Sequence, residues 1–222
     1  MKPSRGLAKP LCLIMKSKTA KPTIAVDIDD VLAAEKEAMR LFVNQRYGLD
    51  LKEADFNIEA PYWGYWEAAQ GIDQKEGRKR YEAFLESGVK AKLNVLRGAT
   101  DAIKKLEQDY ELVIVTSRDD SLMDLTEHWL EDNFPSIFNG VEFVHVWTGD
   151  KKANKATICK KIGAQYLIDD NLEHCEQAAE VGIKALLFGD YGWNRVEKLP
   201  KGVIRVNDWQ AVSNYFNETI KK

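Results

Sequence analysis

The chain has 222 residues, of which 45% are hydrophobic and 30% are charged, and its formal net charge is −3. This length suits one α/β domain with a modest insertion, and the composition excludes a disordered or disulfide-stapled protein. The near-neutral charge argues against a general nucleic-acid-binding protein, because binding along a phosphate backbone needs a large basic surplus. We therefore expect no nucleic acid polymer as a partner, whereas a small basic pocket for a single phosphate is compatible with this charge.

Cysteine usage and hydropathy indicate a reducing compartment and no membrane anchor. The three cysteines, Cys12, Cys159 and Cys175, form no Cys-x-x-Cys pair. A sparse, odd count without framework spacing is typical of a protein whose thiols stay reduced. No stretch approaches the roughly 18 consecutive apolar residues of a membrane-spanning helix. We therefore expect a cytoplasmic protein that does not bind membranes.

Residues 1–21 are interpreted as a flexible basic tail. The first 22 residues contain no acidic residue and six basic ones, which are Lys2, Arg5, Lys9, Lys16, Lys18 and Lys21. Their apolar patch at residues 11–15 is too short for the core of a secretory signal peptide. An organelle transit peptide is one alternative, and an upstream start with Met15 as the true initiator is another. We favour the flexible tail.

From Thr23 onward the sequence alternates short apolar runs with amphipathic segments. The apolar runs predict strands buried on both faces, at residues 23–28, 111–115, 141–146, 165–168, 183–188 and 203–206. The amphipathic segments predict helices at residues 33–47, 99–108, 122–132, 156–162 and 173–181, and from residue 209 onward. Strand–helix alternation of this kind predicts a parallel α/β sheet with right-handed crossovers and helices on both faces.

Residues 49–93 interrupt this alternation. They contain a dense aromatic cluster that includes Tyr62-Trp63-Gly64-Tyr65-Trp66, and then a charged helix near residues 74–87. No strong parallel-sheet strand is visible in this segment. We therefore expect an α/β core made of residues 22–48 and 94–222, with residues 49–93 inserted as a small helical cap after the first strand–helix unit.

Polar side chains follow three of the apolar runs at the point where each run ends. They are Asp27, Asp29 and Asp30 after the first run, Thr116, Ser117 and Arg118 after the second, and Asp169 and Asp170 after the fourth. Ligands of open parallel sheets bind at these carboxyl ends. Buried carboxylates are costly unless they are paired, and clustered carboxylates with room for water suit Mg²⁺. For any one cluster the structural alternative is that its Asp residues cap the following helix. Polar residues at the ends of three strands at once disfavour this alternative.

The ordered set Asp-x-Asp, Thr after a strand, Lys and Asp-Asp resembles the haloacid dehalogenase (HAD) superfamily of aspartate-nucleophile phosphotransferases. The resemblance covers roughly residues 22–193. Within the superfamily the chain is similar to the 5′(3′)-deoxyribonucleotidase-like branch, which shares the Thr116-Ser117 pair, the Ile168-Asp169-Asp170 ending and a small helical cap. The resemblance implies a Rossmann-like, HAD-like α/β fold.

The resemblance also implies roles for the two aspartates that follow the first strand. Asp27 would attack phosphorus and form an aspartyl-phosphate. Asp29 would protonate the leaving alkoxide and later activate the hydrolytic water. The dehalogenase branch lacks this second acid because it expels a halide, so the presence of Asp29 favours phosphoester hydrolysis.

Phosphate-binding residues follow from the same resemblance. Thr116, assisted by Ser117, would hydrogen-bond a phosphoryl oxygen, and a lysine would neutralise charge on the phosphate and the nucleophile. The family's lysine lies near the start of the helix before the Asp-Asp strand. This placement favours Lys155, with Lys152 as the alternative.

The metal expected from the resemblance is Mg²⁺, held by Asp27, the Asp169/Asp170 pair and the carbonyl of Asp29. Which of Asp169 and Asp170 binds it directly stays open. Asp30 departs from the family pattern, which usually has Gly there. Asp is among the side chains best tolerated in left-handed turn geometry, so we assign Asp30 no chemistry.

Several residues near these motifs have two interpretations. Trp63 and Trp66 either stack on a nucleobase, worth about 1–3 kcal/mol per base, or form the core of the cap. Arg118 either binds a phosphate or pairs with Asp119, Asp120 or an acid of the cap. The histidines, His128, His145 and His174, share no metal-binding spacing and are interpreted as surface or packing residues. Residues 193–195 lie in a loop that could border the site.

The sequence thus predicts a Mg²⁺-dependent phosphomonoester hydrolase that uses an aspartyl-phosphate, most specifically a 5′-nucleotidase of nucleoside or deoxynucleoside monophosphates. Its partner would be a small, nucleotide-like phosphate ester. The sequence leaves open whether the protein forms a homodimer. The alternatives are a phosphatase of a sugar phosphate or phosphoprotein, and a non-catalytic binding protein with the HAD fold. Intact Asp27, Asp29, Thr116 and Asp170 argue against the last of these.

Overall fold

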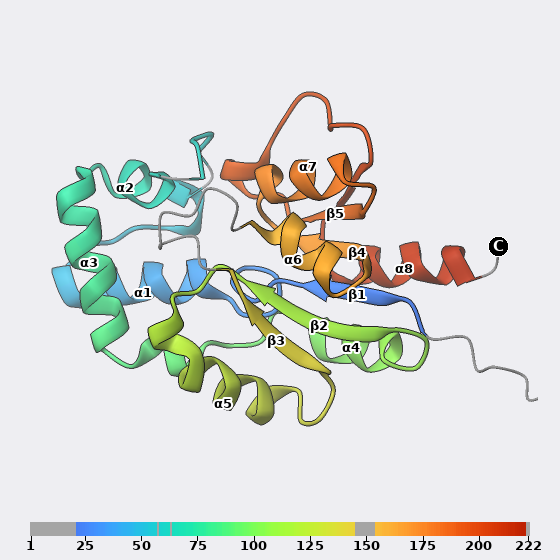
Figure 1. The fold of residues 1–222 in the computed structure, drawn as a ribbon. Coiled ribbons are helices and arrows are strands. Elements are labelled where there is room, and N and C mark those ends of the chain that lie inside the picture. Colours follow the sequence, from blue (N-terminus) through green and yellow to red (C-terminus); the bar gives the residue numbers. More distant parts are fainter. Residues whose placement is uncertain (1–20, 57, 63, 145–153, 221–222) are drawn as a thin grey trace, which may run out of the picture.

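The computed structural model describes residues 21–56, 58–62, 64–144 and 154–220, and its centre is a six-stranded parallel sheet (Figure 1). The strands are β1 (Thr23–Val26), β2 (Glu111–Thr116), β3 (Gly140–Phe143), β4 (Ala164–Asp169), β5 (Lys184–Phe188) and β6 (Val203–Val206). Their spatial order is β3-β2-β1-β4-β5-β6, and every neighbouring pair is parallel. The predicted α/β, Rossmann-like architecture is therefore confirmed.

The strand order reverses between β1 and β4, and this reversal fixes where a ligand can bind. In the register of the sheet, Val26 lies opposite Ile114 of β2 on one side and Ile168 of β4 on the other. The next residue, Asp27, donates its backbone N–H to the Ile168 carbonyl at 3.0 Å. The carboxyl ends of these three strands are thus level with one another, at the point where open α/β sheets form a crevice.

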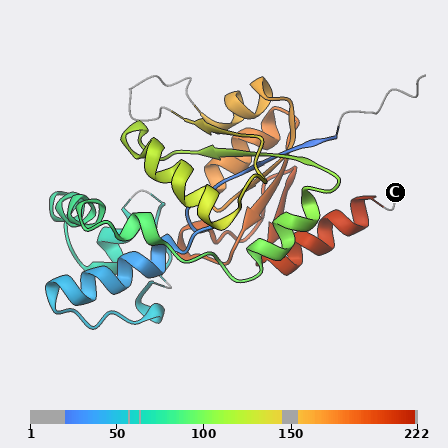
Figure 2. The same cartoon turned by 90° about the horizontal axis from the view of Figure 1, so that it is seen from below.

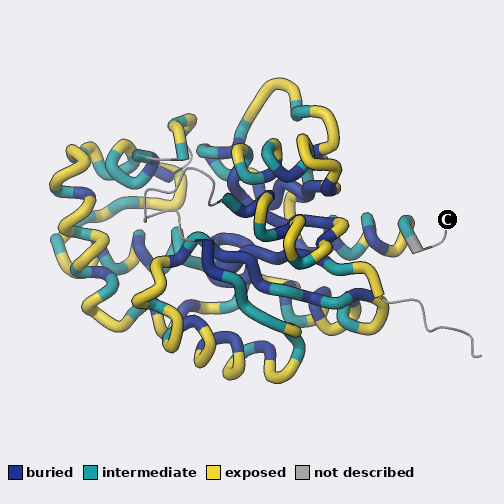
Figure 3. The backbone as a smooth tube through the Cα atoms, in the orientation of Figure 1, coloured by how far each residue is buried: buried dark blue, intermediate teal, exposed yellow. Residues whose placement is uncertain are grey.

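Helices cover both faces of the sheet (Figure 2). One face carries α4 (Ala99–Leu106), α5 (Met123–Asn133) and α8 (Trp209–Ile220), and the other carries α6 (Lys155–Lys161) and α7 (Leu172–Glu180). The strands between them are buried along most of their length (Figure 3). Two-sided burial explains why the strands are short apolar runs without polar alternation.

The side chains of each strand alternate between two hydrophobic clusters. Ile24 and Val26 of β1 pack in the cluster that contains Trp209 of α8, whereas Ala25 packs in the cluster that contains Cys175 of α7. Successive strand residues point to opposite faces, so one four-residue strand contributes to both cores. This double anchoring fixes the position of the aspartates that follow β1.

The segment inserted after α1 (Glu35–Tyr47) is helical and lies with α1 beside the sheet, at the left of Figure 1. Its elements are η1 (Glu53–Phe56), α2 (Tyr65–Gln70), α3 (Gln74–Glu86) and η2 (Val89–Lys92). The helix predicted near residues 74–87 corresponds to α3. The short α2 was not predicted, because it begins within the aromatic cluster and its six residues are too few for a periodic pattern.

Two element boundaries differ from the sequence prediction for identifiable reasons. Helix α1 begins at Glu35 rather than at residue 33, because the Ile28 carbonyl accepts N–H groups of Leu32 and Ala33 in a tight turn. Strand β3 ends at Phe143, which lies opposite Thr116, the last residue of β2. The predicted residues 145 and 146 lie outside the described part of the chain.

Asp30 adopts the left-handed backbone geometry expected for it, with φ of 56°. Its carboxylate accepts the backbone N–H of Lys36 at 3.0 Å, in the first turn of α1. The side chain therefore ties the turn after β1 to the helix that follows it. This contact gives Asp30 a structural role at the position where glycine is usual in the family pattern.

Within the described residues, no helix combines the length and apolar character needed to cross a bilayer. Cys159 and Cys175 are both buried and reduced. They belong to the cluster beneath α6 and α7. These thiols act as small hydrophobic side chains of the core.

We predict that Trp209→Phe lowers the free energy of unfolding by about 1–3 kcal/mol, because the Val31 carbonyl would lose its buried partner. The Trp209 indole is 1% exposed and donates to that carbonyl at 2.8 Å, so α8 supports the turn after β1. Urea unfolding measures this change. The exposed Gln210→Ala on the same helix should change stability by less than about 0.5 kcal/mol, and an equal loss in both variants would contradict the prediction.

Candidate active site

Three carboxylates meet at the carboxyl ends of β1 and β4. One oxygen from each of Asp27, Asp169 and Asp170 lies within 4.8 Å of the others. All three side chains are buried. Three negative charges confined in this way repel one another unless a cation lies among them. Hard oxygen ligands at this spacing fit a small divalent cation such as Mg²⁺.

Lys155 provides one compensating charge. It is the first residue of α6, and its ammonium group lies 2.7 Å from Asp27 Oδ1 and 2.7 Å from Asp169 Oδ2. The lysine is 1% exposed, so both ion pairs are shielded from water. The side chain of Asn154 caps this helix, which fixes the first turn of α6 beside Asp27 and Asp169. Lys155 therefore lies where the sequence predicts the lysine, whereas Lys152 lies outside the described residues.

The carboxylates of this cluster titrate differently. Burial raises the pKa of Asp27 to about 6, although Lys155 opposes the shift. Burial also acts on Asp169, but Lys155 and His174 outweigh it and hold its pKa below the ordinary range. Burial and the neighbouring charges of Asp169 and Asp27 raise the pKa of Asp170 well above its usual value. One lysine thus cannot neutralise all three carboxylates, and Asp170 is the one whose negative charge is least compensated.

The loop after β5 contacts Asp170. Trp193 in η5 (Gly192–Asn194) donates its indole N–H to Asp170 Oδ2 at 2.8 Å. Asn194 is fully buried and donates to the carbonyls of Asp170 and Phe188, each at 2.9 Å. Asp170 Oδ1 has no hydrogen-bond partner among the described residues. A buried carboxylate oxygen left in this way is available to a metal ion.

Asp29 points to a different set of partners from Asp27. Arg118, directly after the Thr116-Ser117 pair, donates Nε to Asp29 Oδ2 at 2.9 Å and a terminal nitrogen to Oδ1 at 2.6 Å. A further guanidinium nitrogen donates to Thr126 Oγ1 of α5 at 3.1 Å. The predicted partners of Arg118 did not include Asp29. The guanidinium nevertheless lies beside the turn after β1, within reach of the region between the strand ends.

A second cation, Lys90 of η2, also reaches Asp29. Its ammonium group lies 2.9 Å from Asp29 Oδ2 and forms an ion pair with Glu35 at the start of α1. Burial disfavours the charged form of Asp29, but Arg118 and Lys90 outweigh it and hold the pKa well below its ordinary value. Sequence reasoning missed Lys90 and Glu35, because a contact between residues 55 positions apart leaves no local pattern.

Thr116 and Ser117 lie at the end of β2, beside β1. Thr116 is 1% exposed, and its hydroxyl accepts the backbone N–H of Arg118 at 3.2 Å. Its backbone carbonyl accepts the N–H of Val144, which extends the pairing of β2 with β3. Thr116 is therefore fixed at the strand end where the sequence predicts a phosphate ligand.

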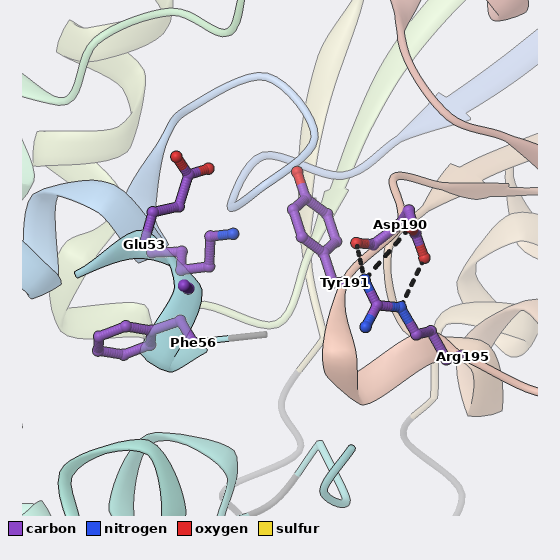
Figure 4. Close-up of a pocket in the computed structure, with 7 residues that line it drawn as sticks. Glu53, Phe56, Asp190, Tyr191 and Arg195 are labelled. Carbon is purple, nitrogen blue, oxygen red and sulfur yellow. Dashed lines mark hydrogen bonds and ion pairs between the residues drawn. The ribbon is translucent and has the colours of Figure 1, made fainter. Parts of the chain in front are cut away.

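A cavity of about 340 Å³ lies between η1 and the loop after β5 (Figure 4). Its walls combine η1 with the loop after β5, and its lining residues are Lys36, Glu53, Ala54, Phe56, Asp190, Tyr191 and Arg195. The Tyr191 hydroxyl donates to the Asp30 carbonyl at 2.8 Å. The three carboxylates are not among its lining residues, so this cavity borders the site without containing it.

The aromatic residues of the insertion largely contact one another. Trp66 packs edge-on against Phe56 with ring centroids 5.2 Å apart, and against Tyr65 at 6.5 Å. Tyr65 in turn lies 4.6 Å from Trp193, which links this cluster to the loop that holds Asp170. Trp63 lies outside the described residues. Base stacking by Trp63 or Trp66 stays a prediction.

His174 lies closer to the site than its interpretation as a surface or packing residue implies. It is in the first turn of α7, and its Nδ1 is 3.3 Å from Asp169 Oδ1. The same oxygen accepts the backbone N–H of Asn171 at 2.9 Å. Asp169 is therefore held on one oxygen by α7 and on the other by Lys155. No histidine spacing in the sequence indicated this contact.

Comparison with protein families gives one match over nearly the whole chain. The sequence pattern of the family described as "5′ nucleotidase, deoxy (Pyrimidine), cytosolic type C protein" matches residues 21–220. All of the site residues named above lie within this range. The basic tail predicted at residues 1–21 falls almost wholly outside it.

Individual relatives agree with this match. An uncharacterised 32.4 kDa protein of enterobacteria phage T4 is 30% identical over 200 residues, covering 87% of this chain and 69% of the relative. A candidate 5′(3′)-deoxyribonucleotidase of Staphylococcus epidermidis is 30% identical over 201 residues, covering 89% and 97%. A candidate HAD hydrolase of Bacillus subtilis, solved with bound magnesium, has the same fold with a TM-score of 0.60 and 15% identity, covering 89% and 99%.

We predict that Mg²⁺ raises the melting temperature of the wild-type protein and that Asp170→Asn loses most of this increase. Binding to the folded state alone stabilises it by mass action. Without metal, Asp170→Asn should melt no lower than wild type, because it removes one of three mutually repelling buried charges. Thermal melts in MgCl₂ and in EDTA measure both effects.

The exposed Asp109→Asn is the matched control and should keep the full response to Mg²⁺. An unchanged Mg²⁺ response in Asp170→Asn would contradict the assignment of the metal site. A large loss of stability in EDTA would contradict the repulsion among the three carboxylates.

Proposed function

Because the chain belongs to the 5′ nucleotidase, deoxy (Pyrimidine), cytosolic type C family, we propose that it hydrolyses nucleoside or deoxynucleoside monophosphates through an aspartyl-phosphate on Asp27. The chain is a phosphoric monoester hydrolase of the HAD superfamily. The proposal adds the nucleophile, the Mg²⁺ requirement and the substrate. The observation that carries it is the position of Asp27, whose carboxylate lies within 4.8 Å of Asp169 and Asp170 and 2.7 Å from the Lys155 ammonium group.

The chain offers a fitting site for Mg²⁺ at Asp27, Asp169 and Asp170, with the Asp29 carbonyl as the further ligand expected from the family resemblance. The support is the spacing of the three carboxylates and the orphaned oxygen of Asp170. When bound, Mg²⁺ would neutralise this cluster and withdraw charge from the phosphoryl group. It would also favour the ionised form of Asp27, which is the nucleophilic form.

In the first half-reaction a carboxylate oxygen of Asp27 attacks phosphorus, and the bond from phosphorus to the ester oxygen breaks. Lys155 keeps the Asp27 carboxylate oriented and offers positive charge to the phosphoryl oxygens. The Thr116 hydroxyl, with Ser117, donates to one of these oxygens. Arg118 turns from Asp29 Oδ1 to the anionic phosphoryl group, and Asp29 takes up a proton from solvent on that oxygen. This proton passes to the leaving alkoxide, so that the product departs as an alcohol.

In the second half-reaction Asp29 acts as a base. It removes a proton from a water molecule as the water oxygen attacks phosphorus, and the bond between phosphorus and Asp27 breaks. Inorganic phosphate leaves, Asp27 is regenerated as a carboxylate, and Asp29 releases its proton to solvent when Arg118 returns to it. Asp27 and Asp29 can divide these roles because they lie two positions apart and the turn at Ile28 gives them different partners.

The substrate proposal rests on the family match and on the insertion. Tyr62 lies beside the site. Burial there and the charges of Asp170 and Asp27 raise the pKa of its hydroxyl well above the usual value. Its ring packs edge-on against Trp193 with centroids 6.2 Å apart. An aromatic side chain at the mouth of a phosphate site can stack on the base of a nucleotide.

We predict that Asp27→Asn lowers kcat by a factor on the order of 10³ or more, because an amide cannot form the acyl phosphate. Mass spectrometry after acid quench should show one added phosphoryl group on the wild-type protein and none on Asp27→Asn. Asp27→Asn activity equal to wild type, at equal Mg²⁺, would contradict the assignment of the nucleophile.

We predict that nucleoside monophosphates exceed sugar phosphates in kcat/KM when the two classes are compared in one panel. Such a panel needs ribo and deoxyribo forms of each base, together with small sugar phosphates as the matched comparison. Measurement of released phosphate under kcat/KM conditions ranks them directly. A sugar phosphate at the head of the panel would overturn the substrate assignment and leave the chemistry of Asp27 untouched.

A further inference from the structure

Lys90 is a buried lysine that the insertion contributes to the active site. It belongs to η2, is 1% exposed and contacts two carboxylates, those of Asp29 and Glu35. A buried ammonium group is costly unless it is paired. Both of its partners are also largely shielded, with side chains 18% and 14% exposed. Lys90 thus lies in a closed ionic cluster at the junction of insertion and core.

The backbone that follows Lys90 is fixed to the core. The carbonyl of Leu93 accepts the indole N–H of Trp129 at 2.8 Å, and the carbonyl of Asn94 accepts the N–H of Ala34 at 2.9 Å. Helices α1, α3 and α5 all pack against η2. The ammonium group of Lys90 is therefore held at a defined place relative to the turn that carries Asp29.

The two oxygens of Asp29 have unequal partners. Lys90 donates to Oδ2, whereas among the described residues Oδ1 accepts a side-chain hydrogen bond from Arg118 alone. When Arg118 turns to a phosphoryl group, Oδ1 becomes available to carry a proton. Lys90 still holds Oδ2 at that moment, and a protonated carboxyl group can accept a hydrogen bond on one oxygen while it donates from the other.

We propose that Lys90 is a positioning residue for the acid step: it holds Asp29 through Oδ2 so that Oδ1 faces the leaving oxygen. This inference rests on the proposed function, in which Asp29 is the proton donor. Lys90 also separates Asp29 from Glu35. Without the lysine these two carboxylates would face each other in a largely dry environment and repel, which would displace Asp29 from the leaving group.

The leaving group provides a readout that a purely structural role would not change. A nucleoside leaves as a poor alkoxide that needs a proton, whereas 4-nitrophenolate is a good leaving group that needs little help. We expect Lys90→Met to lower kcat/KM on a nucleoside monophosphate about tenfold or more, while kcat/KM on 4-nitrophenyl phosphate stays within about threefold of wild type. This ratio reports the step in which the leaving group departs and excludes the hydrolysis of the aspartyl-phosphate, in which Asp29 acts as a base for both substrates. Lys90→Arg should retain most of the activity.

Lys92→Met is the matched control, because Lys92 is exposed in the same η2 turn. It should behave as wild type on both substrates. Asp29→Asn is the reference for full loss of the acid and should show the same discrimination between substrates, more strongly. Discrimination in Asp29→Asn but not in Lys90→Met would overturn the role of Lys90 alone. An equal fall in kcat/KM on both substrates in Asp29→Asn would overturn the acid assignment itself, and the role of Lys90 with it.

The double variant Lys90→Met/Glu35→Gln guards against a failure to fold, because it removes one charge of each sign from the cluster. We expect its kcat/KM on the nucleotide to lie between those of Lys90→Met and wild type, since the repulsion is relieved but the hold on Oδ2 is lost. Wild-type rates on both substrates in this double variant would show that Lys90 only neutralises Glu35, and would overturn the proposal.

Discussion

The repulsion among three carboxylates buried at the carboxyl edge of β1 and β4 governs the arrangement around them. Asp27, Asp169 and Asp170 are brought together by the reversal of strand order, which the packing of both faces of the sheet enforces. Lys155 supplies one positive charge, and the loop after β5 supplies neutral donors through Trp193. The remaining negative charge is what would attract the Mg²⁺ of the proposed mechanism.

Two aspartates two residues apart are placed in opposite electrostatic surroundings. Asp27 lies among other carboxylates, and burial raises its pKa to about 6. Asp29 lies between two cations that hold its pKa below the ordinary range, against the effect of burial. Pairs of acids whose environments separate their pKa values in this way can take different roles in one reaction. The turn at Ile28 is the local feature that allows this separation.

The sequence predicted the sheet and the strand ends because both depend on local patterns. A short apolar run that ends in a carboxylate marks a strand buried on both faces and the edge where it meets solvent. On this basis Asp27, Thr116 and Asp169 were expected at one edge, and the structure brings them there. Lys155 was predicted from the family resemblance, in which the lysine lies near the start of the helix before the Asp-Asp strand. Their chemical roles stay proposals.

The contacts that the sequence did not reveal are those between distant residues of unlike segments. Lys90 is one lysine among many in a charged stretch, and only the fold shows that it is buried against Asp29. The partner of Arg118 and the contact between His174 and Asp169 are of the same kind. Side-chain pairing across dozens of residues depends on tertiary packing, and no spacing rule encodes it.

The central claim, that Asp27 forms a covalent intermediate, is tested most directly by the stereochemical course at phosphorus. A phosphate ester made chiral with oxygen isotopes would be transferred by the wild-type enzyme with Mg²⁺, using an alcohol as acceptor in place of water. Two successive in-line displacements, first by Asp27 and then by the acceptor, predict retention of configuration. Inversion would mean a single displacement without a phosphoenzyme and would contradict this account.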